Sequence, residues 1–173
     1  MKKIAVVFII IVSMLAIVSC STTKASDVEP VVREVKISDF TAKEYNADQV
    51  YQMLERFVKD FYDDDDDLMV IYDKDGRTIV VTGLEFSSTV GPLAEDGWII
   101  VSLKFEAKDD KAIITMSFVD AYSMIHIGPF ETSKSQGITE FGLRTLEYQS
   151  QYAADEFQYA ISSYAYYIDN NLI

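Results

Sequence analysis

The chain has 173 residues, and its 28 acidic and 15 basic side chains give a formal net charge of −13 at pH 7. This charge repels polyanions and excludes nucleic acid as a partner, while the length suits one domain with its own core. The chain contains one cysteine and one histidine, which excludes an internal disulfide and a metal centre built on a cluster of these residues.

The N-terminus has the features of a bacterial export signal. Lys2 and Lys3 precede an apolar run of about fifteen residues, which is shorter than the roughly 20 residues of a membrane-spanning helix. The run ends in Ile-Val-Ser-Cys, which resembles a lipoprotein signal, in which the cysteine becomes the lipidated first residue. We therefore expect residues 1–19 to be a lipoprotein signal peptide and Cys20 to carry the acyl chains, such as palmitate, that anchor the protein. The alternative is an ordinary signal or membrane anchor with an incidental cysteine.

The same N-terminus predicts where the protein lies. Residues 20–30 show no apolar periodicity and are expected to form a flexible tether, with residues 31–173 as a single domain close to the membrane. Ser21 directly follows the cysteine, which resembles the sorting signal of outer-membrane lipoproteins. We expect a lipid-anchored protein of the cell envelope, in the outer membrane and facing the periplasm.

A strand and a helix are expected first in the domain. Residues 31–37 place charged side chains between aliphatic ones, which favours a strand. Asn46 is a suitable N-cap for a helix over residues 47–62. The apolar side chains of this helix recur at three- and four-residue steps, which is typical of one buried face: Val50, Met53, Leu54, Phe57, Val58 and Phe61.

Four strands are expected to follow this helix. Their predicted bounds are residues 68–72, 77–86, 98–107 and 112–127. Tight turns join the first pair at residues 73–76 and the second pair at residues 108–111. In the last strand the alternation of apolar and polar residues slips near Phe118, which indicates a β-bulge. Gly, Pro, Ser and Thr predict loops at residues 87–97 and 128–137.

The chain ends in a second helix, over residues 139–169, with or without a break. The predicted order is therefore β-α-β-β-β-β-α, which is an α+β fold. Packing both helices against one face of an antiparallel sheet of about five strands buries every apolar stripe. The other face of the sheet is then partly open.

Two segments resemble a known family. The helix that ends in RFVKDFY and the hairpin IYDKDGRTIVVTG look like parts of exported bacterial proteins of the domain of unknown function 4468. The resemblance covers about residues 31–127 and implies a TBP-like, helix-grip fold. The run of aspartates and the tyrosine-rich last helix depart from what the family leads us to expect. No activity is attached to this family, so the resemblance implies nothing about chemistry.

Five consecutive acidic residues follow the first helix: Asp63, Asp64, Asp65, Asp66 and Asp67. Calcium is bound by six to eight oxygen ligands, so these carboxylates are candidates for a loose metal site. Aspartates are also unfavourable near a helix C-terminus, because that end of the helix dipole is negative. The alternatives are therefore a solvated stop between helix and strand, or an acidic docking patch.

Tyrosines gather in the last helix. Tyr148, Tyr152, Tyr159 and Tyr166 recur at spacings that place them on a common stripe, and tyrosine is enriched at protein interfaces. These four residues are candidates for binding a partner, and packing at the margin of the sheet is the alternative. His126 is no catalytic candidate, because the nearby Ser123 points to the opposite face of the predicted strand.

The sequence favours a non-enzymatic binding or assembly module on a membrane-anchored envelope lipoprotein. It would present a sheet face or the tyrosine-rich helix to another envelope protein. No cofactor is expected, because neither of the glycine-rich phosphate-binding patterns occurs. Two alternatives are a calcium-responsive envelope module that uses the aspartate run and a glycan-acting enzyme with paired carboxylates.

Overall fold

The computed structural model describes residues 23, 27–62, 65–91, 95–127, 130–135, 137–170 and 172. For Glu95 and for residues 124–127 and 130–135 it describes the backbone alone. The elements are β1 (Val31–Lys36), a 3-10 turn η2 (Ile37–Asp39), α2 (Ala47–Phe61), β2 (Met69–Asp73), β3 (Thr78–Val90), β4 (Glu95–Lys108), β5 (Lys111–Ile127), β6 (Phe130–Ser135) and α3 (Glu140–Asp169). The predicted signal peptide and Cys20 lie outside the described residues.

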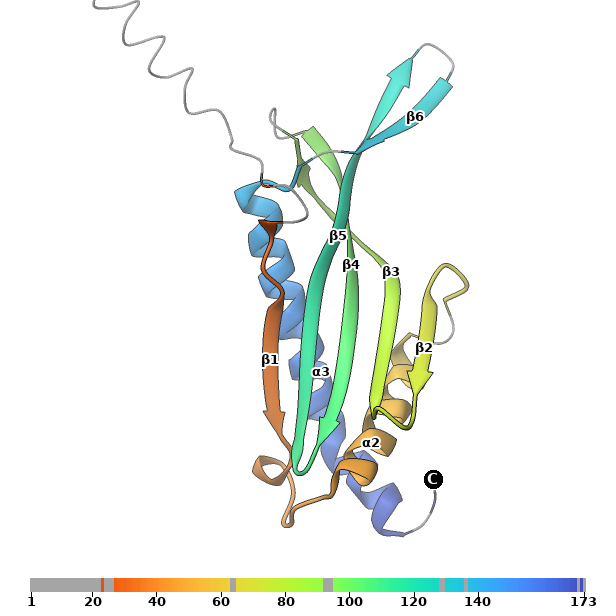
Figure 1. Cartoon of the computed structure of the whole chain (residues 1–173), viewed down its shortest axis with the longest axis vertical. Helices are drawn as coiled ribbons and strands as arrows, with labels where there is room; N and C mark the ends of the chain where they lie inside the picture. The colour runs from red at the N-terminus through yellow and green to blue at the C-terminus, as the bar shows by residue number, and fades with distance from the viewer. Residues whose placement is uncertain are drawn as a thin grey trace, which may run out of the picture.

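The strands form one antiparallel sheet in the order β1-β5-β4-β3-β2 (Figure 1). This path of five strands confirms the predicted α+β architecture. β6 is an addition, because it pairs with the end of β5, from Tyr122 opposite Ser135 to Ile127 opposite Phe130. The prediction of a loop over residues 128–137 is therefore wrong for the stretch that forms β6, since backbone pairing with β5 outweighs its turn-rich composition.

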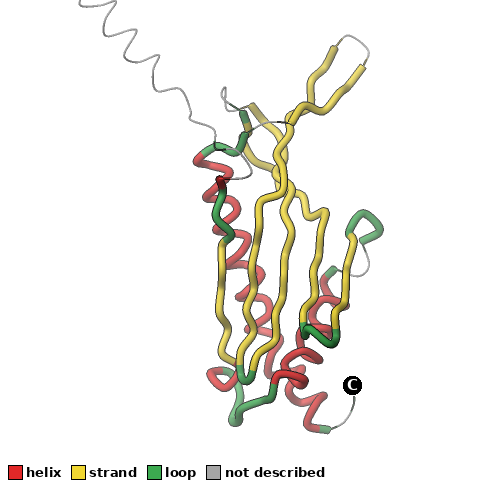
Figure 2. The backbone as a smooth tube through the Cα atoms, viewed as in Figure 1, coloured by secondary structure: helices red, strands yellow, loops and turns green. Residues whose placement is uncertain are grey.

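Both helices pack against the same face of the sheet, as Figure 2 shows. Phe57 of α2 joins the layers, because its ring lies 5.9 Å from that of Phe105 on β4 and 5.4 Å from that of Phe157 on α3. All three rings are fully buried. Burial of this kind stabilises a fold by about 25 cal/mol per Å² of apolar surface, so this aromatic cluster is a main source of stability.

The two helices begin where side chains cap them. Asn46 accepts a hydrogen bond from the backbone N–H of Gln49, and the Gln49 side chain accepts one in return from the Asn46 N–H. Thr139 accepts a hydrogen bond from the N–H of Gly142 at the start of α3. α3 then continues for 30 residues as one helix, which decides against the break allowed by the sequence.

Two β-bulges bend the long strands. Ile100 pairs with Asp120 and Val101 with Phe118, so Val119 is the extra residue, as the slipped alternation predicts. A second bulge occurs at Gly83, whose φ of +94° is a left-handed conformation that favours glycine. β3 and β4 also run well into residues 87–97, so the loop predicted there is largely strand.

One short contact ties the predicted tether to the domain. The backbone N–H of Thr23 donates to the carbonyl of Ile138 at 3.0 Å, and the Ile138 N–H donates to the Thr23 carbonyl at 3.2 Å. Ile138 also bridges to Val90, so Thr23 lies beside the start of α3 and the end of β3. Within the described residues, no helix has both the length and the apolar character needed to cross a membrane.

Candidate binding surfaces

Neither α2 nor α3, the two α-helices of the described residues, covers the second face of the sheet. The alternating residues of β4 illustrate the division, because Ile99, Val101, Leu103 and Phe105 are buried under the helices. Their neighbours Trp98, Ile100, Ser102 and Lys104 point to the opposite side, where the first three are partly accessible and Lys104 is exposed. At the β2 edge this face also exposes Met69 and Ile71. The predicted open face is therefore present, and it is partly apolar.

Aromatic residues from two strands meet on this open face. Trp98 on β4 stacks on Tyr122 of β5, with ring centroids 5.5 Å apart and an angle of 22° between the ring planes. The Tyr122 hydroxyl donates a 2.7 Å hydrogen bond to the carboxylate of Glu85 on β3. This bond is the main cause of the raised pKa of Tyr122. Three adjacent strands thus hold one aromatic pair and one carboxylate in place.

A hollow of about 610 Å³ lies beside this group. Its lining comes from the α2–β2 connection, from the bulge in β3 and from β4: Asp65, Asp67, Leu68, Gly83, Leu84, Glu85 and Ile100. A Cβ atom added to Gly83 would approach the Asp67 carbonyl to 3.0 Å, so the bulge brings β3 close to this connection. The hollow combines three carboxylates with apolar walls, which suits a cationic group on an apolar stem.

The aspartate run lies between α2 and β2. The Asp65 carboxylate accepts a hydrogen bond from the backbone N–H of Asp67, and the Asp65 carbonyl accepts one from Leu68. These bonds form a turn that leads into β2. Asp63 and Asp64 lie outside the described residues. In the part of the chain that is described, no three His, Cys, Asp or Glu side chains gather closely enough to hold a metal ion, and calcium binding by the full run stays a prediction.

The four candidate tyrosines of α3 point to solvent. Tyr159 is 91% exposed and Tyr148 is 66% exposed, and Tyr152 and Tyr166 are also more than half exposed. Phe141, near the start of the helix, is exposed on the same side. Their exposure favours an interaction surface over packing at the sheet margin. Tyr164, by contrast, is buried and donates a hydrogen bond to Asp60 of α2.

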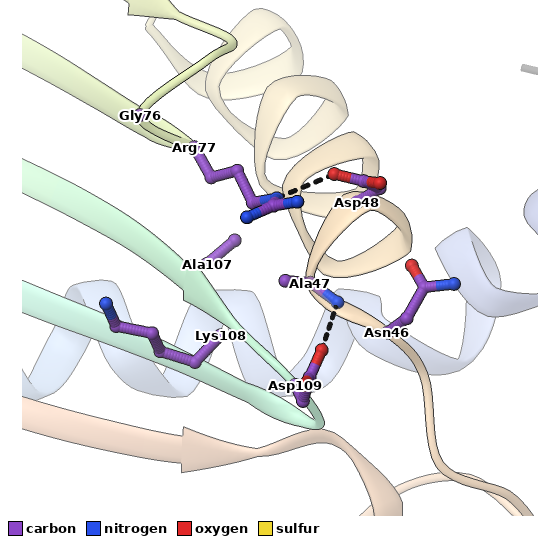
Figure 3. A pocket seen from close by; sticks show the side chains of 8 residues that line it. All are labelled: Asn46, Ala47, Asp48, Gly76, Arg77, Ala107, Lys108 and Asp109. Carbon is purple, nitrogen blue, oxygen red and sulfur yellow. Dashed lines mark hydrogen bonds and ion pairs between the residues drawn. The ribbon is translucent and has the colours of Figure 1, made fainter.

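A second cavity, of about 330 Å³, lies where α2 begins beside the β2–β3 and β4–β5 turns (Figure 3). It has basic side chains and a helix N-terminus, which are the parts of an anion site. These groups are already paired with acidic residues. Asp109 accepts a hydrogen bond from the Ala47 N–H at 2.9 Å, and Asp48 forms an ion pair with Arg77 at 2.6 Å. Lys108 pairs with Glu106. This region is therefore a polar joint between the helix and the sheet.

Sequence reasoning missed Trp98, Tyr122 and Glu85. A signal for Trp98 was available, because strand alternation places the single tryptophan among the polar residues of β4 and away from the core. Its pairing with Tyr122 depends on the strand register and on the bulge at Val119, which the sequence does not specify residue by residue. The side chain of His126 lies outside what the structure describes.

Comparison with known proteins supports the fold. No family model matches the chain, and no curated protein matches it. A TBP-like protein from Parabacteroides distasonis has a similar structure, with a TM-score of 0.53 and 14% identity over 78% of this chain and 96% of that one. A DUF4468 family protein from Bacteroides ovatus gives a TM-score of 0.48 and 11% identity over 76% of this chain and 84% of that one. The fold is thus TBP-like, as the sequence resemblance implies, and neither description states an activity.

Proposed function

We propose that this protein is a lipid-anchored, non-enzymatic binding module of the bacterial envelope that holds a basic segment of another envelope protein on its open sheet face. The observation that carries this proposal is the uncovered face itself. Both helices lie on the other side of the sheet, and the open side presents the Trp98–Tyr122 pair. Aromatic residues fixed by neighbouring strands are well suited to binding, because they lose little conformational freedom.

Charge supports a basic partner. Asp65, Asp67 and Glu85 line the hollow next to the aromatic pair, and the whole chain has a net charge of −13. A field of this sign steers positively charged segments towards the protein and repels acidic ones. Lysine and arginine side chains also place apolar stems along apolar walls and bind over aromatic rings, which Leu84, Ile100 and Trp98 would provide.

The lipid anchor is a prediction from the sequence, and the contact between Thr23 and the domain is consistent with it. If Cys20 is lipidated, the short segment 21–23 leads from it to the first described pairing, which joins Thr23 to Ile138. Such a segment spans about 10 Å at most. The end of the domain that contains the start of α3 would then lie close to the membrane surface. A partner of the open face would accordingly be a membrane protein or another protein of the same compartment.

Affinity capture from envelope extracts tests the proposal. We expect wild-type protein to retain basic proteins that a Trp98→Ala/Glu85→Gln variant releases, with retention falling as salt rises. Gln52→Ala, on α2 at the opposite face, is the matched control and should behave as wild type. A protein list that is identical for all three baits, with each bait folded, would contradict the proposal.

A glycan-acting enzyme is the second candidate, because the carboxylates of the hollow lie beside the stacked rings of Trp98 and Tyr122. Sugars stack on such rings, and glycosidases use two carboxyl groups about 5–10 Å apart. Incubation with envelope glycans, followed by measurement of released reducing ends, tests this function. Turnover that Glu85→Gln or Asp67→Asn abolishes would favour the enzyme, and no release with folded wild-type protein would exclude it for the glycans used.

A further inference from the structure

α3 carries an exposed stripe opposite its buried face. At 100° per residue, Phe141, Tyr148, Tyr152, Tyr159 and Tyr166 fall within an arc of about 40°. Buried residues such as Leu146, Phe157 and Ile161 occupy the other side of the helix. We propose that this aromatic stripe is the seam of a homodimer, in which α3 of a second copy packs against it in the antiparallel direction.

The spacing along the stripe is that of a coiled-coil seam. Its positions recur at steps of four and three residues: Phe141, Thr145, Tyr148, Tyr152, Asp155, Tyr159, Ser162 and Tyr166. This is a 3.5-residue repeat, which keeps one face of a helix directed at a partner helix. It continues along nearly all of the 30-residue helix, and its members other than the half-buried Thr145 are exposed.

The stripe is complementary to itself when it is reversed. We consider two antiparallel α3 helices whose two-fold axis passes between Ala153 and Ala154. In this arrangement large side chains lie opposite large side chains, hydroxyl groups opposite hydroxyl groups, and the one carboxylate of the stripe opposite a tyrosine. The layers, with the second-copy residue given second in each pair, are Phe141 with Tyr166, Thr145 with Ser162, Tyr148 with Tyr159, and Tyr152 with Asp155. A two-fold interface requires such self-complementarity, which an unrelated partner would not need.

Charge also selects the antiparallel direction. A parallel pair would place Asp155 beside Asp155 of the second copy, and like charges at close range repel. The antiparallel pair separates them. Its flanking contacts join Gln151 to Gln158 and Gln149 to Glu156 of the second copy, so no two acidic residues meet. A strip with so few charges is unusual on a chain whose net charge is −13.

The surface available is of the right order for a dimer. Five aromatic side chains that are each more than half exposed offer roughly 500 Å² per protomer, against about 800 Å² in a standard interface. Flanking side chains of α3 add to this area. In this dimer the α3 helices lie at the interface and both open sheet faces point away from it. Dimerisation therefore does not depend on what the open faces bind. The two Thr23 residues of the dimer, each beside the start of α3, would lie roughly 45 Å apart, which is the length of that helix.

Cysteine cross-linking in the full-length protein tests the register. We expect a Tyr148→Cys/Tyr159→Cys double variant to form a covalent dimer under mild oxidation in the intact envelope. Either single variant, like the wild type, should form no covalent dimer, and co-expression of the two single variants should restore the covalent dimer. A disulfide within one chain cannot explain the result, because these positions lie about 16 Å apart along α3, beyond the reach of about 7 Å.

Three outcomes would overturn the proposal. Covalent dimers of the single variants would indicate a parallel seam, and a link to a protein of another mass would indicate a different partner. A double variant that forms no covalent dimer under oxidation, while its helical circular dichroism matches wild type, would exclude the seam. A second measurement uses Tyr159→Glu, which places charge in the stripe at a 91% exposed position. Sedimentation in detergent should show its dimer weakened at least about tenfold, and unchanged dimerisation contradicts the proposal.

Discussion

Trp98 on β4 stacks on Tyr122 of β5, with ring centroids 5.5 Å apart, on the side of the sheet that neither helix covers. The Tyr122 hydroxyl in turn holds Glu85 of β3 at 2.7 Å. An aromatic pair placed in a core would be explained by packing alone. Here both residues are partly accessible and lie next to an acidic hollow, which is why the open face is the best-supported binding surface.

The aromatic cluster between the layers should dominate stability. We expect Phe57→Ala to lower the free energy of unfolding by about 3–5 kcal/mol, because it removes a fully buried ring that contacts Phe105 and Phe157. Phe61→Ala, one helical turn later, is the control and should cost about half as much, because the Phe61 ring packs 4.7 Å from that of Phe57 but is 49% exposed. Chemical denaturation of both variants measures the difference. Equal losses would contradict the described packing of α2.

The end of α3 should contribute stability that depends on pH. The Asp169 carboxylate accepts a hydrogen bond from Tyr45 and pairs with Lys43, whose ammonium is the main reason that the pKa of Asp169 is lowered. A carboxyl group with a lowered folded-state pKa stabilises the fold above its unfolded pKa of about 3.9. That contribution is lost as the pH falls through the folded-state pKa.

We therefore expect Asp169→Asn to lower Tm at about pH 7, by an amount that shrinks as the pH falls through the folded-state pKa of Asp169, because the wild-type carboxyl is protonated below that pKa. Asp75→Asn, in the exposed β2–β3 turn, is the control and should leave Tm unchanged both above and below that pKa. Thermal melts on both sides of it provide the measurement. If Asp169→Asn still melts below wild type at low pH, the protonated Asp169 carboxyl stabilises this contact by hydrogen bonding, and charge is not the cause.

The aspartate run should protect an exposed strand edge. Within the described residues β2 pairs only with β3, and Met69 and Ile71 are half-exposed or more. Charged residues beside such an edge prevent other strands from pairing with it. We expect Asp65→Ser/Asp66→Ser/Asp67→Ser to aggregate faster than wild type, as measured by light scattering, with little change in the free energy of unfolding.

A triple variant with the same charge change elsewhere, Glu29→Gln/Asp39→Asn/Glu44→Gln, separates this local role from net charge and should aggregate as wild type does. Both variants should be measured with millimolar calcium and with a chelator. A calcium-dependent rise in Tm that the aspartate variant loses would instead assign the run to a metal site. If the two variants aggregate equally fast, the aspartate run acts only through the net charge of the protein.

Local patterns predicted the helices and most strands well. Asn46 and the spacing from Val50 to Phe61 locate α2 to within one residue, because capping and periodicity are local properties. The bulge at Val119 was also predicted, since an extra residue shifts the alternation of its own strand. β6 was missed because its Thr and Ser residues are typical of loops, and only pairing with the end of β5 makes it a strand.

The candidate surfaces were harder to predict, for a physical reason. The four tyrosines share a stripe by spacing alone, but whether that stripe faces the sheet or the solvent depends on how α3 packs. The Trp98–Tyr122 pair needs the register of two strands across a bulge, and the hollow needs the bend at Gly83 to meet the α2–β2 connection. These are contacts between distant segments, which no local pattern encodes.

Site-specific photo-cross-linking in the living cell tests most directly whether the open sheet face holds a partner. A photoreactive residue at Ile100, beside the acidic hollow, should give a covalent adduct with a basic envelope protein, while one at Gln52 on α2 should not. Addition of Glu85→Gln should reduce the adduct at Ile100. An adduct from Gln52 alone, or none from Ile100 in protein that is folded and exported, would exclude the open sheet face as the binding surface.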